Sequence, residues 1–226
     1  MRFEFATAGA IVFGPGVFRS ALPRMASLGR QTLVITGKHP DRHADHLEQL
    51  QKKGLSLQRV SVGGEPTVDS VEAAVEQARR ASCELVIGMG GGSVLDTAKA
   101  VAALLTHAGP LTDYLEIVGK GLPLQNDPAP CVAVPTTAGT GAEVTCNAVV
   151  ASPSHRVKVS MRSPLMLPDV AIVDPELTYS MPPHITAGTG LDALTQLMEA
   201  FVSPYANPMT DALCREGIKR AAPALD

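Results

Sequence analysis

Three consecutive glycines followed by a serine, Gly90–Ser93, are the residues of this sequence that point most directly to chemistry. They lie between an apolar run at residues 84–89 and a segment whose apolar residues recur at helical spacing. Glycine lets a phosphate approach the backbone because it has no Cβ. The unpaired N–H groups of a first helical turn then face the phosphate, and the helix dipole favours its negative charge. The spacing predicts a phosphate-binding turn at Gly91, Gly92 and Ser93. The alternative is a strand-to-helix connection that only needs a flexible backbone, and because the motif is neither GxGxxG nor Walker A, it does not name the ligand.

A second polar segment, residues 135–145, also follows an apolar run and combines threonines with glycines. Threonine hydroxyls donate hydrogen bonds to phosphate or amide oxygens. Thr136, Thr137, Thr140 and Thr145 are therefore candidate ligand contacts. The alternative is a loop stabilised by local bonds from threonine to the backbone.

Three charged residues stand near these segments or in an alternating stretch. Asp96 lies one helical turn beyond Ser93, where its carboxylate either accepts from ribose hydroxyls or complements the helix dipole. Lys99 is one turn further on and is placed to pair with Asp96. Lys158 stands in the alternating stretch 157–159, where it is either a solvated strand lysine or a residue that faces a ligand.

The elements that must position these residues alternate between strand and helix. Strands are expected at 32–36, 57–62, 84–90, 131–134 and 170–174, with helices at 41–53, from 68 onward after an N-cap at Thr67, and from 93 onward. This alternation predicts an α/β fold with a parallel sheet, and ligands in such sheets bind outside the carboxyl ends of the strands. Glycines stand at three of those ends, around residues 37, 63 and 90.

The two ends of the chain differ from this alternating pattern. Residues 3–5 and 10–13 flank Ala8-Gly9 and are expected to form a β-hairpin. Beyond residue 180 the pattern is helical only, at 191–201 and 210–222. We therefore expect two domains, an α/β domain over residues 1–180 and the beginning of an all-helical domain over residues 181–226.

Composition excludes several classes of function. The 226 residues carry a net charge of −3 with 4% aromatics and no tryptophan, which argues against a nucleic-acid partner. The four cysteines form no CxxC pair and are expected to be buried thiols in a reducing compartment. With neither a signal peptide nor an apolar run of membrane-spanning length, the sequence predicts a soluble cytoplasmic protein without a membrane partner.

Four motifs together resemble the group III, iron-containing alcohol dehydrogenases of the dehydroquinate synthase-like superfamily. They are GGGSVLDTAKA at 90–100, PTTAGTGAEVT at 135–145, the VDPEL-to-MPP passage at 173–183 and GLDALTQLMEAFVSPYANPMTDAL at 190–213. The resemblance covers essentially the whole chain. It implies an N-terminal domain that binds a nicotinamide dinucleotide and a helical domain that supplies iron or zinc. Hydride would pass between a small alcohol or aldehyde and the nicotinamide in the cleft between them.

The resemblance also implies roles for individual residues. It assigns Gly91, Gly92 and Ser93 to the pyrophosphate, Asp96 to the nicotinamide end, Thr136, Thr137, Thr140 and Asn147 to the adenine and ribose pocket, Lys158 to the ribose hydroxyls, and Asp192 to the metal.

The sequence departs from the family at the expected metal site. Gln196 stands where the family has histidine, four residues after Asp192, and an amide oxygen is a poorer donor than imidazole for Fe²⁺ or Zn²⁺. None of the six histidines matches the two further ligands that the family carries in later helices. We therefore expect at most half a metal site, in a chain that is a fragment of a longer gene product.

A third departure concerns the choice of cofactor. Many members of the family have aspartate at position 37, where it binds the 2′-hydroxyl of NAD. Gly37 removes that charge, and Lys38, His39 and Arg42 stand close by. Both NAD and NADP therefore remain candidate cofactors.

Two alternatives to a metal-assisted alcohol dehydrogenase remain open. Gln196 is compatible with a metal-independent reductase of the maleylacetate type, and the short helical region is compatible with a non-catalytic NAD(P)-binding fragment. The exposed N-terminal hairpin and the incomplete helical domain predict self-association into a homo-oligomer.

Overall fold

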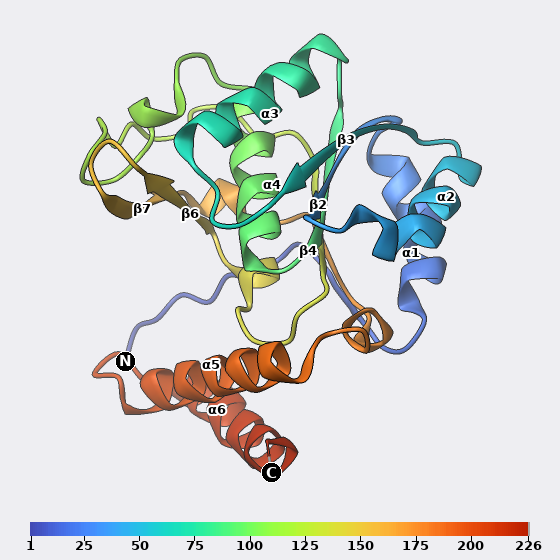
Figure 1. The fold of residues 1–226 in the computed structure, drawn as a ribbon. Coiled ribbons are helices and arrows are strands. Elements are labelled where there is room, and N and C mark those ends of the chain that lie inside the picture. Colours follow the sequence, from blue (N-terminus) through green and yellow to red (C-terminus); the bar gives the residue numbers. More distant parts are fainter. Residues whose placement is uncertain (226) are drawn as a thin grey trace.

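The computed structural model describes residues 1–225 as an α/β body with a pair of helices beside it (Figure 1). Six strands pair in parallel in the order β1-β8-β5-β4-β2-β3. They are β1 (Ile11–Phe13), β2 (Gln31–Gly37), β3 (Ser56–Val62), β4 (Leu85–Gly90), β5 (Cys131–Pro135) and β8 (Val170–Val173). The predicted α/β class with a parallel sheet is confirmed.

Helices cover both faces of this sheet. One face packs against α1 (Val17–Leu28) and α2 (Ala44–Lys52), and the other against α3 (Val68–Arg80) and α4 (Gly92–Leu105). Successive strand residues point to opposite faces. Val34 accordingly belongs to the core on the α1–α2 side, while Leu33 and Ile35 belong to the core on the α3–α4 side. The predicted N-cap of α3 is also present, because Thr67 Oγ1 accepts from the Ser70 N–H at 3.2 Å.

The strand register brings the predicted glycine turns to one edge of the sheet. Gly37 pairs with Val62, and Gly90 pairs with Pro135. β3 pairs with one side of β2, and β4 pairs with the other side. The strand order therefore reverses between β2 and β4. A crevice outside the carboxyl ends of the strands at such a reversal is where open α/β sheets bind ligands.

A two-stranded antiparallel hairpin, β6 (Asn147–Ser152) and β7 (Val157–Arg162), stands apart from the main sheet. Buried residues alternate along β6, but in β7 both Val157 and Lys158 are exposed and the alternation begins only at Val159. The hairpin is attached to the loop after β3 through the Ala151 N–H, which donates to the Pro66 carbonyl at 2.7 Å.

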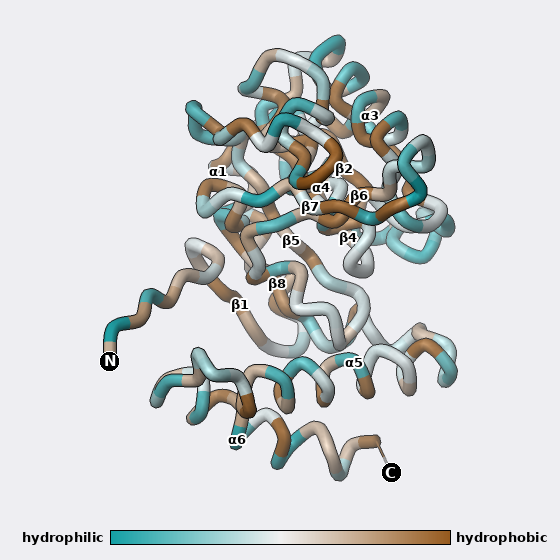
Figure 2. The backbone as a smooth tube through the Cα atoms, turned by 90° about the vertical axis from the view of Figure 1, so that its left-hand side faces the viewer, coloured by the Kyte–Doolittle hydropathy of each residue, from teal (hydrophilic) through white to brown (hydrophobic). Residues whose placement is uncertain are grey.

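The C-terminal region forms two helices, α5 (Pro183–Val202) and α6 (Pro208–Ala221), which lie together below the α/β body in both views (Figures 1 and 2). α5 begins earlier than predicted, because proline at a first helical position costs no hydrogen bond. Asn207 caps α6 by accepting from the Met209 and Thr210 N–H groups. Within the part of the chain that the structure describes, no helix is long and apolar enough to cross a membrane.

Two features of the N-terminal region differ from expectation. The predicted hairpin of residues 3–13 is wrong, because β1 pairs in parallel with β8 and residues 1–10 form no strand. Its apolar alternation reflects a partner far away in sequence rather than a neighbouring strand. The sequence reasoning also missed α1, since Pro23 lies inside the helix and Gly14-Pro15-Gly16 precedes it.

Candidate functional site

A cavity of about 630 Å³ opens at the carboxyl edge of the sheet, where α4 begins. This volume lies within the usual range for small-molecule sites. Most of the predicted site residues line the cavity: Gly92, Ser93, Asp96, Thr140, Asn147, Lys158, Asp192 and Gln196. Thr145 of the threonine cluster lines it too, but the sequence reasoning did not assign the other lining residues to a site: Glu65, Pro66, Ala142 and Val149.

The glycine turn and the threonine loop are in close contact. α4 begins at Gly92, and Gly91 occupies its N-cap. A Cβ added at Gly92 would lie 3.0 Å from Cγ2 of Thr140, and one at Gly91 would lie 3.2 Å from Cγ2 of Thr137. The first N–H groups of α4 have no acceptor within the helix, so the Gly92–Ser93 end of the cavity presents donors and the positive end of the helix dipole. This arrangement can bind an anion.

The remaining predicted residues are not among those that line the cavity. The Thr136 N–H donates to the Gly90 carbonyl at 3.0 Å, which holds the two strand ends together. Thr137 lies against Gly91. Gly37 is at the end of β2, where an added Cβ would meet nothing within 4 Å in the described residues.

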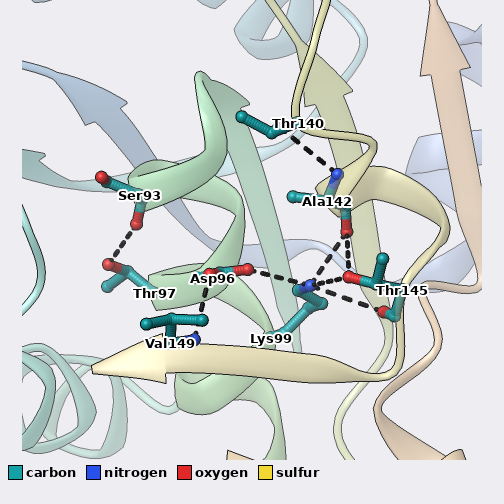
Figure 3. Close-up of polar contacts among 8 residues, drawn as sticks. All are labelled: Ser93, Asp96, Thr97, Lys99, Thr140, Ala142, Thr145 and Val149. Atoms are coloured by element: carbon teal, nitrogen blue, oxygen red, sulfur yellow. Dashed lines mark hydrogen bonds and ion pairs between the residues drawn. The ribbon is translucent and has the colours of Figure 1, made fainter. Parts of the chain in front are cut away.

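Asp96 and Lys99 form the predicted ion pair, and the pair extends into a network (Figure 3). Nζ of Lys99 lies 3.0 Å from Oδ1 of Asp96, and it also donates to the Ala142 carbonyl and to the Thr145 hydroxyl. Oδ2 of Asp96 accepts from the Val149 N–H at 3.0 Å. Asp96 therefore has a structural role in addition to its place in the cavity lining.

A second ion pair lies at the mouth of the cavity. Nζ of Lys158 on β7 is 3.0 Å from Oε1 of Glu65, which lies in the loop after β3. Both side chains are at least half exposed, so the pair is open to exchange with a ligand. Sequence reasoning missed Glu65, although the glycines at 63 and 64 mark the same strand end.

Burial affects two titratable groups near the network. Burial raises the pKa of the Glu143 carboxyl, with its own backbone N–H and Lys99 acting in the opposite direction. Burial also raises the pKa of the Cys131 thiol to about 12, so this cysteine is an unreactive core residue. All four cysteines are free, as predicted, but only Cys131 and Cys214 are buried, whereas Cys83 and Cys146 are partly exposed.

The two predicted metal ligands project from one face of α5 into the cavity. Asp192 and Gln196 are four residues apart, but Nε2 of Gln196 donates to the Gly139 carbonyl at 3.2 Å. Over residues 1–225, no group of three or more histidine, cysteine, aspartate or glutamate side chains is placed to hold a metal ion. One carboxylate and one amide do not make up the three or four protein ligands of a tetrahedral site, so the described residues do not complete a metal centre.

Two family profiles match the chain in succession. The family described as "Iron-containing alcohol dehydrogenase" matches residues 8–175, and "Fe-containing alcohol dehydrogenase family, C-terminal" matches residues 186–225. Among similar proteins, a choline dehydrogenase of Bacillus subtilis is 37% identical over 97% of this chain and 55% of its own length. A sulfoacetaldehyde reductase of Bilophila wadsworthia is 40% identical over 97% of this chain and 57% of its own length.

Solved structures agree with this relationship. A 1,3-propanediol oxidoreductase superimposes with a TM-score of 0.93 at 33% identity, over 100% of this chain and 59% of that protein. A sulfoacetaldehyde reductase of Bifidobacterium kashiwanohense in complex with NAD⁺ superimposes with a TM-score of 0.89 at 32% identity, over 98% of this chain and 59% of that protein. The chain therefore spans about half the length of the relatives that it matches.

Proposed function

Because this chain belongs to the iron-containing alcohol dehydrogenase family, we propose that its cavity binds a nicotinamide dinucleotide. The observation that carries the proposal is the contact between Gly92 and Thr140 at the start of α4, at the carboxyl edge of the sheet. Glycine there lets Thr140 lie against the start of α4, beside the N–H groups of the first helical turn, which would donate to a pyrophosphate. The NAD⁺ complex of a related sulfoacetaldehyde reductase supports this choice of ligand.

The residues of the cavity suit the other parts of a dinucleotide. The first N–H groups of α4 would donate to the pyrophosphate, with Ser93 beside them. Thr136, Thr137, Thr140 and Asn147 would contact adenine and ribose. Lys158 would reach the ribose hydroxyls after releasing Glu65, and Asp96 would lie at the nicotinamide end.

As part of a complete enzyme, the chain would serve hydride transfer between a small alcohol or aldehyde and the nicotinamide. The bound cofactor supplies the hydride chemistry, and the protein orients the cofactor and excludes water. The names of the relatives, among them a choline dehydrogenase and a sulfoacetaldehyde reductase, support this substrate class. Asp192 and Gln196 would face the reacting end from α5.

Further proposals concern the cofactor and the organisation of the chain. Gly37 presents no carboxylate to repel a 2′-phosphate, and Lys38 and Arg42 follow it, so we expect NADP as well as NAD to bind.

For the organisation of the chain, we propose a dinucleotide-binding domain over residues 1–180 and a helical region over residues 181–226. Self-association of the chain in the cytoplasm also remains a prediction.

The direct test is titration of the full chain with NADH and NADPH, followed by cofactor fluorescence. Gly92→Asp adds a carboxylate at the start of α4 that would repel the pyrophosphate, and its Cβ would press on Thr140, so it should weaken binding at least about a hundredfold. Ser20→Asp is the matched control, since it adds the same charge on an exposed position of α1, across the sheet. Unchanged binding by Gly92→Asp would contradict the site, and no binding by the unmodified chain would contradict the function. Turnover of a short aldehyde would exclude a non-catalytic module.

A further inference from the structure

We propose that Lys99 is a positioning residue for the dinucleotide cavity and that its buried ammonium fixes the loop 136–145 against α4. The inference rests on the proposed function of that cavity. The Lys99 side chain is 0% exposed, so its charge has no access to solvent. A buried ammonium costs stability unless it is paired and hydrogen-bonded, so a role must be sought in its partners.

The partners of Lys99 account for all three of its N–H donors. Its Nζ lies 3.0 Å from Oδ1 of Asp96, 2.9 Å from the Ala142 carbonyl and 2.9 Å from the Thr145 hydroxyl (Figure 3). These three partner residues line the dinucleotide cavity, whereas Lys99 lines a different one. Lys99 therefore acts on a ligand through its partners.

One ammonium thus connects three segments of the cavity wall. Asp96 belongs to α4 and accepts from the Val149 N–H of β6, while Ala142 and Thr145 belong to the loop after β5. The same loop carries Thr140, whose hydroxyl accepts from the Ala142 N–H and whose methyl group meets the glycine turn. Without Lys99, the loop would keep its packing against α4 but lose the buried hydrogen bonds that Lys99 donates to Ala142 and Thr145. The Asp96 carboxylate would then face an anionic dinucleotide without its paired cation.

A cavity of about 260 Å³ on the other side of Lys99 makes this role testable by chemical rescue. Cys131, Met166 and Asp169 line it together with Lys99. Truncation of Lys99 to alanine would enlarge this cavity toward Asp96 and Thr145. A small alkylammonium ion could then occupy the position of the missing group and donate the same hydrogen bonds.

The experiment compares NADH binding by the unmodified chain and by Lys99→Ala, with thermal unfolding measured in parallel. We expect affinity to fall roughly tenfold to a hundredfold, as for loss of charged hydrogen bonds. Methylammonium or ethylammonium should restore most of it. Tetramethylammonium carries the same charge but has no N–H donor, so it should restore nothing. Val101→Ala is the matched control on the same helix, because Val101 is fully buried in the α3–α4 core. It should lower the unfolding midpoint without changing NADH affinity.

The outcomes separate this inference from the proposed function. If the unmodified chain does not bind NADH, the proposed function fails first. If the unmodified chain binds and Lys99→Ala binds within twofold of it, Lys99 has no positioning role. If NADH binding is weakened and no amine restores it, the loss comes only from packing and the inference is overturned.

If Lys99→Ala does not fold, Thr145→Val offers a second test, because it removes one hydrogen-bond acceptor of Lys99 at nearly constant side-chain volume. We expect severalfold weaker binding from it, and unchanged binding would again overturn the inference.

Discussion

Two helices contribute to the same cavity, yet they are held in the molecule in different ways. Ten of the 14 residues of α4 are buried, whereas none of the 20 residues of α5 is buried in the described chain. α4 lies between the sheet and its neighbours, and α5 lies below the body (Figure 1). The cavity therefore has one wall that belongs to the core and one wall that is attached from outside.

The loop after β5 is the connection between the two walls. Its Gly139 carbonyl accepts from Gln196, and the backbone there is so close to Thr189 that an added Cβ would clash with it. On the other side, the same loop is fixed to α4 through Lys99. Both α5 and α6 have apolar stretches, coloured brown in Figure 2. Their large exposed apolar side chains include Leu191, Met198, Val202, Met209 and Leu213.

The largest difference should appear when the same substitution is made in both helices. Leu95 and Leu191 each precede a cavity aspartate, but Leu95 is 1% exposed and Leu191 is 57% exposed. Leu95→Ala should lower the free energy of unfolding by about 2–5 kcal/mol, because it leaves a void in the core. Leu191→Ala should change it by less than about 0.5 kcal/mol. Urea denaturation measures both, and equal losses would show that α5 is as tightly packed as α4.

Alanine substitutions at two glycines should change stability by smaller amounts and in opposite directions. A Cβ at Gly90 would lie 2.6 Å from Cγ2 of Val94, whereas a Cβ at Gly188 would meet nothing within 4 Å among the described residues. Gly90→Ala should therefore cost about 1–3 kcal/mol of stability. Gly188→Ala should add about 0.5–1 kcal/mol, because alanine restricts the unfolded chain and favours helix. A loss at Gly188 would mean that α5 is covered at this position in solution.

The smallest expected effect concerns the connecting loop. Burial raises the pKa of Glu143 in the folded state. Its contribution to stability is therefore complete below the pKa of the unfolded chain and is lost as pH rises through the folded pKa. Relative to the unmodified chain, Glu143→Gln should gain stability as pH rises above about 4, where an ordinary glutamate carboxyl loses its proton. Unfolding midpoints across this range would measure the gain, and a constant difference would contradict it.

Much of the α/β body could be predicted because its signals are local. The apolar run before Gly37, the Thr67 cap and the glycine turn at residues 90–92 each depend on neighbours in sequence. The pairing of β1 with β8 could not be predicted, since the partner strands are far apart in the chain. The same reason explains why Glu65 was missed, because its place in the cavity depends on β7. Asp192 and Gln196 were found through a family motif, and their helical spacing alone carries no ligand identity.

The attachment of the hairpin to the loop after β3 has a consequence for how binding ability arises during folding. The cavity needs Glu65 and Pro66, the start of α4, the hairpin residues and finally Gln196 to be in place together. Closing such long loops is entropically slow compared with forming local helices and neighbouring strands. We therefore expect a refolding chain to recover its helix content before it recovers ligand binding. The ability to bind a ligand would then be the last property that the polypeptide acquires.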